Sequence, residues 1–283
     1  MILLSGATGR VGVAASRILD EANIPFRVLV RDADKFTFKK SENIEVVCGD
    51  LENPADVELA MQGVTKALLL MSNNPGQFEI ETSFAESAES AGVQHLVKVS
   101  SMEASPTTTA VLPALHYQSE QNIQSLDLSW TFLRPNFYMQ NMLMYSASIS
   151  KAGVFALPLG ESKTAMIDAR DVGAVVAAVL MESGHENKIY QLTGPELISF
   201  NEVAQRMSSA LDKPVSYKQQ TPDEYRAVLA SFIHSKWQLD AVCELFEEIA
   251  AGSLETLTRD ATKILAREPI SIEEFTRDFS AAF

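Results

Sequence analysis

A glycine-rich segment at residues 6–12, Gly6-Ala7-Thr8-Gly9-Arg10-Val11-Gly12, constrains what this chain can fold into more than any other feature. A strand candidate at residues 2–5, Ile2-Leu3-Leu4-Ser5, precedes it, and residues 10–21 carry apolar side chains at helical spacing. Glycines in a strand-to-helix turn allow a tight bend and the close approach of a pyrophosphate. The free N–H groups and positive dipole of the helix end attract phosphates. The segment predicts a dinucleotide site formed by Gly6, Thr8, Gly9, Arg10, Val11 and Gly12; a tight turn without a ligand is the alternative.

The first half of the chain alternates short apolar runs with helical patterns. Strands are expected at residues 2–5, 26–30, 44–48, 67–71, 96–100 and 129–133, with helices between them that include 10–21, 78–91 and 115–126. Such alternation predicts βαβ units with right-handed crossovers and a parallel sheet. The second half is less regular and more helical.

We therefore expect an α/β fold: a Rossmann-type doubly wound parallel sheet with a smaller, mainly helical C-terminal lobe. Residues 1–150 are expected to form the dinucleotide-binding domain, to which residues 164–192 return, and residues 151–283 to form most of a substrate lobe. A chain of 283 residues with 46% hydrophobic side chains buries enough surface to fold without disulfides or a metal.

Arg31, at the end of the second predicted strand, bears on the choice of cofactor. NAD-binding folds of this type usually place an Asp or Glu there, to bond the ribose 2′-hydroxyl. A guanidinium instead matches a 2′-phosphate in charge and in bidentate geometry. We therefore expect NADP(H) to be preferred, with NAD(H) possible because Asp32 would reach the ribose if the strand ended one residue later. A solvated loop charge is the alternative role for Arg31.

The other strand ends supply further candidate cofactor contacts, because ligands of doubly wound sheets bind at the carboxyl ends of the strands. Asp50 could flank the adenine, but it is equally typical of a turn. Residues 71–76 could touch a ribose or form an ordinary loop. Lys98, inside the fifth strand, could point into a site or reach solvent at the end of the sheet, and we favour solvent. The candidates in this group are Asp50, Leu51, Met71, Ser72, Asn73 and Ser100.

The charge balance bears on possible partners. The chain carries 23 Lys and Arg against 37 Asp and Glu, a net charge of −14. An acidic surface repels phosphate backbones and anionic lipids, and the largest basic cluster is only Lys39-Lys40. The longest apolar stretch, residues 172–181, is too short to span a bilayer about 30 Å thick. We expect no direct nucleic-acid partner and no membrane partner.

Cysteine usage and the amino terminus bear on the compartment. Two cysteines, Cys48 and Cys243, without a Cys-x-x-Cys pair, favour a reducing environment. The first residues lack the basic region and the long apolar region of a secretory signal. The sequence therefore predicts a cytoplasmic monomer or homodimer without a metal site.

Several segments, taken in order along the chain, resemble the NmrA-like family of atypical short-chain dehydrogenases/reductases. The resemblance runs from residue 1 to the C-terminus. Besides residues 6–12, it rests on Val30-Arg31-Asp32, Gly49-Asp50, Leu133-Arg134-Pro135-Asn136-Phe137-Tyr138-Met139-Gln140-Asn141, Asp168-Ala169-Arg170-Asp171-Val172-Gly173, Gln191-Leu192-Thr193-Gly194-Pro195-Glu196 and residues 272–279.

The resemblance implies a Rossmann domain and a small C-terminal substrate domain. The family includes enzymes similar to quinone oxidoreductases, azoreductases and triphenylmethane reductases, and also redox-sensing regulators without turnover. It implies that the segment Arg134-Pro135-Asn136-Phe137 lies near the nicotinamide, with Phe137 beside the ring. The alternative is a strand that simply terminates at Pro135. Phe, Tyr and Met residues between 137 and 145 suit a flat aromatic acceptor, although core packing accounts for at least half of them.

The helix after the fifth strand departs from ordinary short-chain dehydrogenases. Those enzymes use Tyr-x-x-x-Lys, in which the lysine charge lowers the pKa of the phenol for proton transfer. Here His116 and Glu120 occupy that spacing, as in some NmrA-like members, and Tyr117 has Gln121 four residues on. A histidine with an unperturbed pKa of about 6.5 suits proton donation, and Glu120 could orient it. His116 is therefore the candidate catalytic residue; an i,i+4 pair on a solvated helix face is the alternative.

The sequence thus favours an NAD(P)H-dependent oxidoreductase that transfers hydride from NADPH to a small aromatic acceptor, such as a quinone or an azo compound. The proton can come from water, so a dedicated acid is not required, and the cofactor supplies the difficult chemistry. The alternative is a non-catalytic NADP(H)-binding redox sensor acting through a protein partner. A sugar-nucleotide epimerase is disfavoured by the missing Tyr-x-x-x-Lys.

Overall fold

The structure, a computed structural model, describes residues 1–36 and 41–283; the Lys39-Lys40 pair lies outside the described residues. The chain divides into two compact units. The first comprises Met1–Ser101, Leu115–Arg134 and Ala169–Tyr190, and the second comprises Met102–Ala114, Pro135–Asp168 and Gln191–Phe283. The assignment of residues 1–150 to dinucleotide binding and of residues 151–283 to substrate binding stays a prediction.

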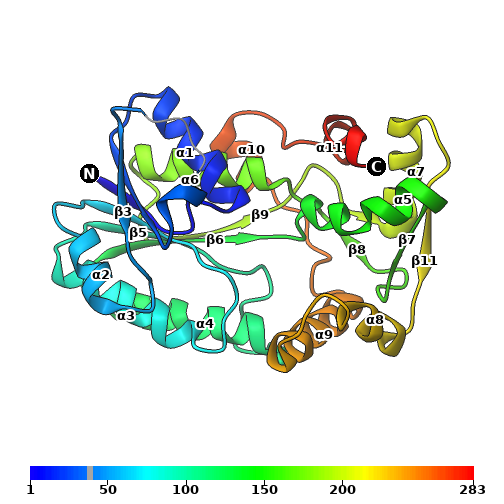
Figure 1. Ribbon diagram of the computed structural model, residues 1–283, viewed down its shortest axis with the longest axis horizontal. Helices are drawn as coiled ribbons and strands as arrows, with labels where there is room; N and C mark the ends of the chain where they lie inside the picture. The colour runs from blue at the N-terminus through cyan, green and yellow to red at the C-terminus, as the bar shows by residue number, and fades with distance from the viewer. Residues whose placement is uncertain (37–40) are drawn as a thin grey trace. The chain divides into compact units, whose positions relative to one another are not determined.

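The first unit is built on a seven-stranded sheet with the strand order β3-β2-β1-β4-β5-β6-β9 (Figure 1). Neighbouring strands from β3 to β6 run parallel, with Leu3 of β1 opposite Arg27 on one side and Ala67 on the other. The order 3-2-1-4-5-6 is that of a Rossmann-type doubly wound sheet, so the predicted fold class is confirmed. The strands are β1 (Ile2–Leu4), β2 (Phe26–Val30), β3 (Ile44–Cys48), β4 (Lys66–Leu69), β5 (His95–Val99), β6 (Ser129–Pro135) and β9 (Lys188–Leu192).

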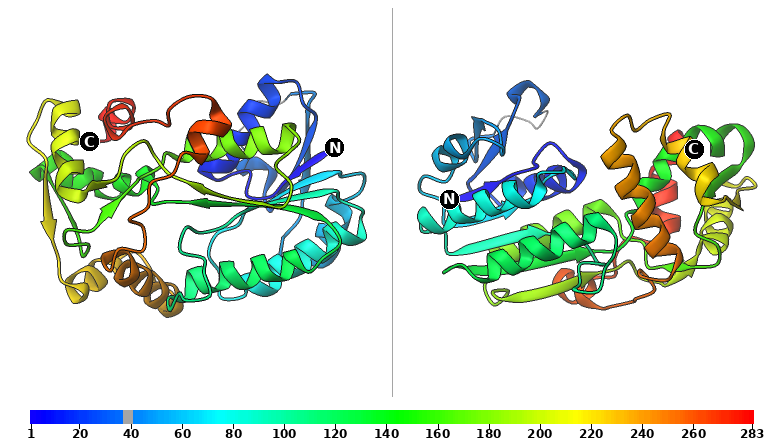
Figure 2. Two further views of the ribbon diagram at one scale, coloured as in Figure 1. Left: turned by 180° about the vertical axis from the view of Figure 1, so that it is seen from behind. Right: turned by 90° about the horizontal axis from the view of Figure 1, so that it is seen from below.

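Helices cover both faces of this sheet, as Figures 1 and 2 show. One face carries α1 (Arg10–Glu21) and α6 (Ala169–Met181), and the other carries α2 (Pro54–Ala60), α3 (Gln77–Ser90) and α4 (Val111–Gln124). A short 3-10 helix, η1 (Ala33–Lys35), follows β2. Because both faces are covered, β1 and β5 are buried along their whole length, as parallel strands usually are.

The second unit is mainly helical, with two small sheets. In these sheets β8 (Lys163–Thr164) pairs antiparallel with β10 (Ile198–Ser199), and β7 (Val154–Leu157) pairs in parallel with β11 (Ser216–Gln219). Of the apolar residues expected to suit an aromatic acceptor, Phe137, Met139 and Met142 are buried in this unit's core. Its helices are η2 (Met139–Tyr145), α5 (Ser146–Ala152), α7 (Phe200–Leu211), α8 (Pro222–Leu229), α9 (Lys236–Ala250), α10 (Asp260–Leu265), α11 (Ile272–Asp278) and η3 (Ser280–Ala282).

Helix α4 begins at Val111, earlier than the start predicted at residue 115. The backbone N–H of Ala110 donates to Glu248 Oε1 at 2.8 Å, and that of Val111 donates to Glu244 Oε2 at 3.2 Å. Two carboxylates of α9 therefore satisfy N–H groups that a first helical turn leaves without acceptors. The predicted start was wrong because these partners lie far along the chain, where no local pattern reveals them.

Helix α6 contains the apolar stretch at residues 172–181 and packs against α1. At Gly173 an added Cβ would lie 2.5 Å from the Cβ of Ala14 and 2.7 Å from the carbonyl oxygen of Val11. The glycine therefore lets the two helix backbones approach closely. In the part of the chain that the structure describes, neither α6 nor any other helix is long and apolar enough to cross a membrane.

We expect Gly173→Ala to lower the free energy of unfolding by about 1–2 kcal/mol, because the added methyl group forces α6 away from α1. In an ordinary helix interior the same change stabilises the protein by about 1 kcal/mol. A decrease in the free energy of unfolding would therefore show that the contact between α6 and α1 outweighs helix propensity. Urea denaturation of the two proteins measures the difference. A variant more stable than the parent would contradict the close packing described here.

Candidate functional site

The glycine-rich loop closes tightly at the carboxyl end of β1. Gly6 has φ of +63°, and an added Cβ there would lie 2.5 Å from the carbonyl oxygen of Leu70. A Cβ at Gly12 would lie 2.3 Å from the carbonyl oxygen of Gly6, so only glycine allows α1 to start so close to β1. These two contacts fix the shape of the turn.

The amino terminus of α1 is open to an anion. Its N-cap residue is Gly9, which has no side chain to cap the helix, and its first turn carries no acidic residue. Thr8, Gly9 and Arg10 are exposed, whereas Val11 and Gly12 are buried. The N–H groups of a first helical turn have no acceptor within the helix, and they and the helix dipole favour a phosphate. The geometry is therefore compatible with a phosphate at this helix end, and the binding role of these residues stays a prediction.

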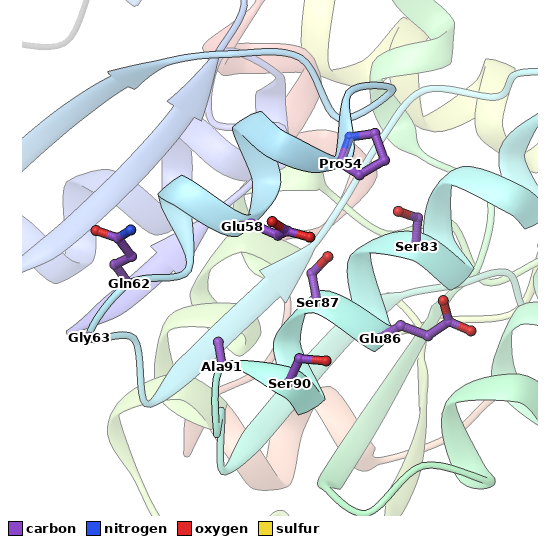
Figure 3. A pocket seen from close by; sticks show the side chains of 9 residues that line it. All are labelled: Pro54, Glu58, Gln62, Gly63, Ser83, Glu86, Ser87, Ser90 and Ala91. Atoms are coloured by element: carbon purple, nitrogen blue, oxygen red, sulfur yellow. The ribbon is translucent and has the colours of Figure 1, made fainter.

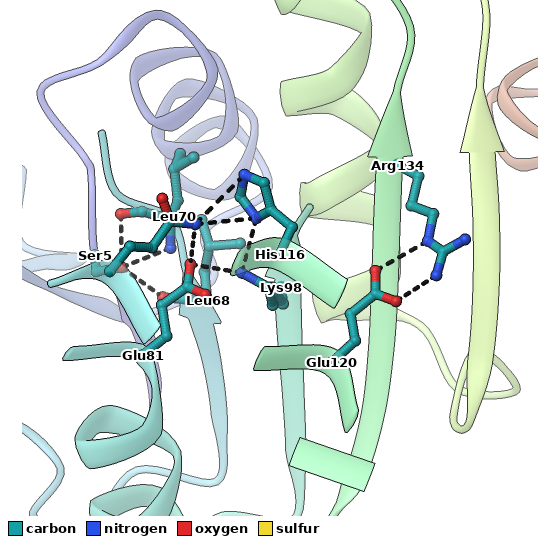
Figure 4. Close-up of polar contacts among 9 residues, drawn as sticks. Ser5, Leu68, Leu70, Glu81, Lys98, His116, Glu120 and Arg134 are labelled. Carbon is teal, nitrogen blue, oxygen red and sulfur yellow. Dashed lines mark hydrogen bonds and ion pairs between the residues drawn. The ribbon is translucent and has the colours of Figure 1, made fainter. Parts of the chain in front are cut away.

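Ser5, which sequence reasoning missed, ties this turn to the neighbouring strand (Figure 4). Its buried hydroxyl lies 3.0 Å from the carbonyl oxygens of Leu68 and Leu70 and accepts a hydrogen bond of 2.8 Å from the N–H of Leu70. The ends of β1 and β4 are thus joined through one side chain. A polar residue that closes an apolar run directly before the glycines was the available indication.

Arg31 and Asp32 follow β2 and differ in their contacts. The carboxylate of Asp32 accepts a hydrogen bond of 3.0 Å from the N–H of Asp34 and lies 3.7 Å from Lys35 Nζ. Arg31 is exposed and makes no hydrogen bond or ion pair with the described residues. The aspartate is thus used in the local turn while the guanidinium stays accessible, which supports Arg31 as the 2′-phosphate contact and leaves that role a prediction.

The candidates after β3, β4 and β5 lie at the same edge of the sheet as the glycine-rich loop, because these strands run parallel. Asp50 Oδ1 accepts a hydrogen bond of 3.1 Å from the N–H of Glu52, so this carboxylate does form a turn. Leu51 packs at the rim of the apolar core. The remaining candidates are the half-buried Met71, the exposed Ser72 and Asn73, and Ser100, whose buried hydroxyl has no hydrogen-bond partner among the described residues.

Asn136 and Phe137, which follow Pro135, form part of the core of the second unit. Asn136 Oδ1 accepts hydrogen bonds from Thr164 Oγ1 at 2.6 Å and from its neighbour's N–H at 2.7 Å, and its Nδ2 donates to Leu254 O at 3.1 Å. Phe137 meets Phe200 edge to face. These contacts give both side chains a packing role, and their expected role beside a cofactor stays a prediction.

Lys98 is completely buried, so the expectation that it reaches solvent is wrong. Its Nζ lies 2.5 Å from Oε1 of Glu81 on α3 and 3.2 Å from Nδ1 of His116 on α4 (Figure 4). The amide nitrogen of Gln77, the first residue of α3, lies 3.1 Å from the same Nδ1. The burial of Glu81 could have been predicted from the sequence, because Glu81 precedes Phe84 by three residues and so lies on the apolar face of the same helix.

Glu120 does not orient His116. Its carboxylate forms a two-pronged ion pair with Arg134, in which Arg134 Nε donates to Oε1 at 2.9 Å and Nη2 donates to Oε2. The expected pair of His116 and Glu120 within one helix is therefore replaced by a pair between α4 and β6. Glu120 neither orients His116 nor lies on a solvated helix face, because it is buried. A planar guanidinium with parallel donors matches a carboxylate better than an imidazole does.

The pKa of His116 differs from the value expected. Burial lowers this pKa well below its ordinary value, and the positive charges of Lys98 and Arg134 lower it further. The ring is therefore neutral near pH 7. Because the pKa is lower in the folded state, the unfolded chain binds a proton at this histidine more readily than the folded chain does. The free energy of unfolding is therefore highest above the ordinary pKa of about 6.5 and decreases as the pH falls below it.

A groove of about 680 Å³ opens between α2 and α3 (Figure 3). None of the candidate cofactor or catalytic residues lines it, and its walls carry no cationic, thiol or imidazole group. Among the described residues, no group of three His, Cys, Asp or Glu side chains could hold a metal ion. The lining residues are Pro54, Glu58, Gln62, Gly63, Ser83, Glu86, Ser87, Ser90 and Ala91.

We expect Lys98→Met to lower the free energy of unfolding by about 3–5 kcal/mol, because it leaves the buried carboxylate of Glu81 without a charge partner. The double variant Lys98→Met/Glu81→Leu should recover most of that loss, since an apolar pair can replace a buried ion pair. Urea denaturation measures both. Lys236→Met is the matched control: it breaks an exposed ion pair with Asp240 and should cost about 1 kcal/mol or less. Equal losses in the single and double variants would contradict the pairing.

Comparison with known proteins finds a matching family model, similar sequences and similar structures. The model of the NmrA-like family matches residues 1–276. The NAD(P)H azoreductase of Xenophilus azovorans is 34% identical over 287 residues, which cover 100% of this chain and 99% of that one. The structure of the NADPH-dependent quinone oxidoreductase of Escherichia coli complexed with NADPH is similar with a TM-score of 0.89 and 25% identity, covering 99% and 100% of the two chains. The triphenylmethane reductase of a Citrobacter species, complexed with NADP(H), has a TM-score of 0.88 at 23% identity over 100% of both chains, a likeness of fold alone.

Proposed function

The chain belongs to the NmrA-like family, and we propose that it is an NADPH-dependent reductase of small aromatic acceptors such as quinones or azo compounds. It is an oxidoreductase of the NAD(P)H-dependent azoreductase and quinone reductase type, like the two relatives it resembles over nearly its whole length. The observation that carries the proposal is the uncapped amino terminus of α1, held against β1 by Gly6 and Gly12. A non-catalytic sensor is not favoured, because these relatives are named as reductases.

The residues present fit a dinucleotide. A Cβ at Gly6 or Gly12 would collide with backbone, which shows that the turn is shaped by contacts only glycine permits. The exposed Thr8, Gly9 and Arg10 surround the helix end and leave it accessible. When bound, NADPH supplies the hydride, and the protein contributes binding and orientation.

In this proposal each candidate residue has a binding task. The first-turn N–H groups of α1 hold the diphosphate, and Thr8 adds a hydroxyl donor. Arg31 pairs with the 2′-phosphate, because its guanidinium is exposed at the end of β2 and makes no ion pair with the described residues. Leu51 contributes apolar contact to the adenine, and the loop after β4 contacts a ribose.

The proposal is tested by mixing the purified chain with NADPH and a panel of quinones and azo dyes, and following the absorbance of the reduced cofactor. We expect acceptor-dependent loss of that absorbance. Gly9→Val is the matched control, because a side chain at the N-cap keeps a diphosphate from approaching the helix end. Tight NADPH binding without oxidation by any acceptor would instead favour the sensor.

We expect Arg31→Glu to raise the Kd for NADPH by about 10- to 100-fold, because a charge-assisted contact to a phosphate contributes about 1.5–3 kcal/mol. The Kd for NADH should change little, since NADH lacks the 2′-phosphate. Calorimetric titration of both nucleotides measures the ratio. Arg17→Glu is the control, because it alters an exposed residue of α1 by the same charge. Equal weakening of NADPH and NADH in Arg31→Glu would exclude the assigned role.

A further inference from the structure

The buried network around Lys98 goes beyond what cofactor binding requires. Lys98 and Glu81 have exposed side-chain fractions of 0% and 1%, and the lysine also contacts the imidazole of His116 (Figure 4). All three residues belong to the first unit. A buried charge is costly unless it is paired, and Glu81 is the partner that pairs with the ammonium of Lys98. The same ammonium also lies against one nitrogen of the His116 ring.

The contact fixes which nitrogen of His116 carries the proton. A lysine ammonium has three N–H donors and no acceptor. Since Lys98 Nζ lies 3.2 Å from Nδ1, Nδ1 must accept the hydrogen bond and cannot itself carry a proton. The amide nitrogen of Gln77 lies 3.1 Å from the same Nδ1 and 3.4 Å from Nε2, so the choice between the two nitrogens rests on the lysine. A neutral ring in this environment is therefore protonated on Nε2.

The network lies close to the edge of the sheet where the dinucleotide is expected. Lys98 is the penultimate residue of β5, and side chains two apart on a strand share a face, so Lys98 and Ser100 point to the same side. Gln77 opens α3, which starts from this edge, and α4 also starts from it as the crossover helix after β5. His116 as a residue is half-buried, so solvent reaches part of it.

We propose that Lys98, held by Glu81, is a positioning residue that fixes His116 as the neutral Nε2–H tautomer, so that the ring offers a hydrogen bond to the heteroatom of the acceptor. This inference rests on the proposed function. Hydride transfer brings two electrons to the acceptor and oxidises the nicotinamide. The acceptor's oxygen or nitrogen becomes negative, accepts the hydrogen bond from Nε2, and takes its proton from water, which leaves hydroxide. His116 gives up no proton in this step.

The charges around the ring support a neutral donor over an imidazolium acid. Lys98 contacts the ring from β5, and the positive charge of Arg134 on β6 also acts on it. The two nearby carboxylates are directed at those cations: Glu81 of α3 pairs with Lys98, and Glu120 of α4 pairs with Arg134. Burial and both cations depress the pKa of His116, so imidazolium does not form near pH 7.

The tautomer can be read directly by NMR. The full-length chain is labelled with 15N-histidine, and long-range 1H–15N correlation spectra distinguish the protonated from the bare ring nitrogen. His116→Gln identifies the signals of His116 among those of the four histidines. We expect Nε2 protonated and Nδ1 bare throughout about pH 6–8, the range in which an unperturbed histidine titrates. A proton on Nδ1 in the unaltered protein would overturn the proposal, whatever the variants do.

The double variant Lys98→Met/Glu81→Leu removes the lysine donor to Nδ1 without leaving an unpaired buried charge, and the amide of Gln77, which contacts both ring nitrogens, remains. We expect its His116 to show a mixture of tautomers and its kcat to fall, because part of the population then carries the proton on Nδ1. The ring stays neutral near pH 7, since burial and Arg134 still lower its pKa. The Kd of the double variant for NADPH should be unchanged. Glu120→Gln is the matched control on α4, since Glu120 bonds Arg134 and not His116; its tautomer should match the parent. An unchanged tautomer in the double variant would overturn the proposal.

The kinetic arm separates this inference from the proposed function. We expect His116→Gln to lower kcat by about 100-fold, the usual loss for one well-placed donor, with an unchanged Kd for NADPH. An unchanged kcat would overturn the role of the ring while leaving the reductase activity established. If the parent reduces no acceptor, the proposed function fails, and so does the catalytic role of His116. The NMR spectra would still determine the tautomer of His116 in that case.

Discussion

The contact between the start of α1 and the end of β1 is the constraint on which the site depends. Gly12 lies so close to the carbonyl oxygen of Gly6 that an added Cβ would come within 2.3 Å of it. On its other side α1 is packed against α6 at Gly173. The helix is thus held from two directions, and its uncapped amino terminus stays at the carboxyl edge of the sheet. An anion at that edge meets fixed N–H groups, so little ordering is required of the protein on binding.

The sequence predicted the features that arise from local patterns. All six strands of the first half appear at the expected places, because short apolar runs between helical patterns are typical of buried parallel strands. The glycine-rich turn was predictable for the same reason, since a tight strand-to-helix turn leaves no room for a side chain at certain positions. The strand ends followed from topology, because a parallel sheet brings its carboxyl ends to one edge.

The sequence could not predict which charged groups pair. Lys98 was expected in solvent because lysine is rarely buried without a partner, and that partner, Glu81, lies on another element. Glu120 was expected to serve His116, four residues away, but Arg134 on β6 offers a better geometric match. The start of α4 depends in the same way on Glu244 and Glu248 of α9. Each of these pairings is a tertiary contact, and spacing along one helix carries no information about it.

The energetics of the network around Lys98 suggest why it is present. A buried ion pair is weak evidence for stability, since an apolar pair of similar size is often as good or better. This network is also incompletely satisfied, because Glu81 Oε2 and Gln77 Oε1 have no hydrogen-bond partner among the described residues. A partly satisfied polar network is worse for stability than an apolar core would be. The simplest physical reason to retain it is that a lysine at this place determines the protonation of a neighbouring histidine, which no apolar side chain can do.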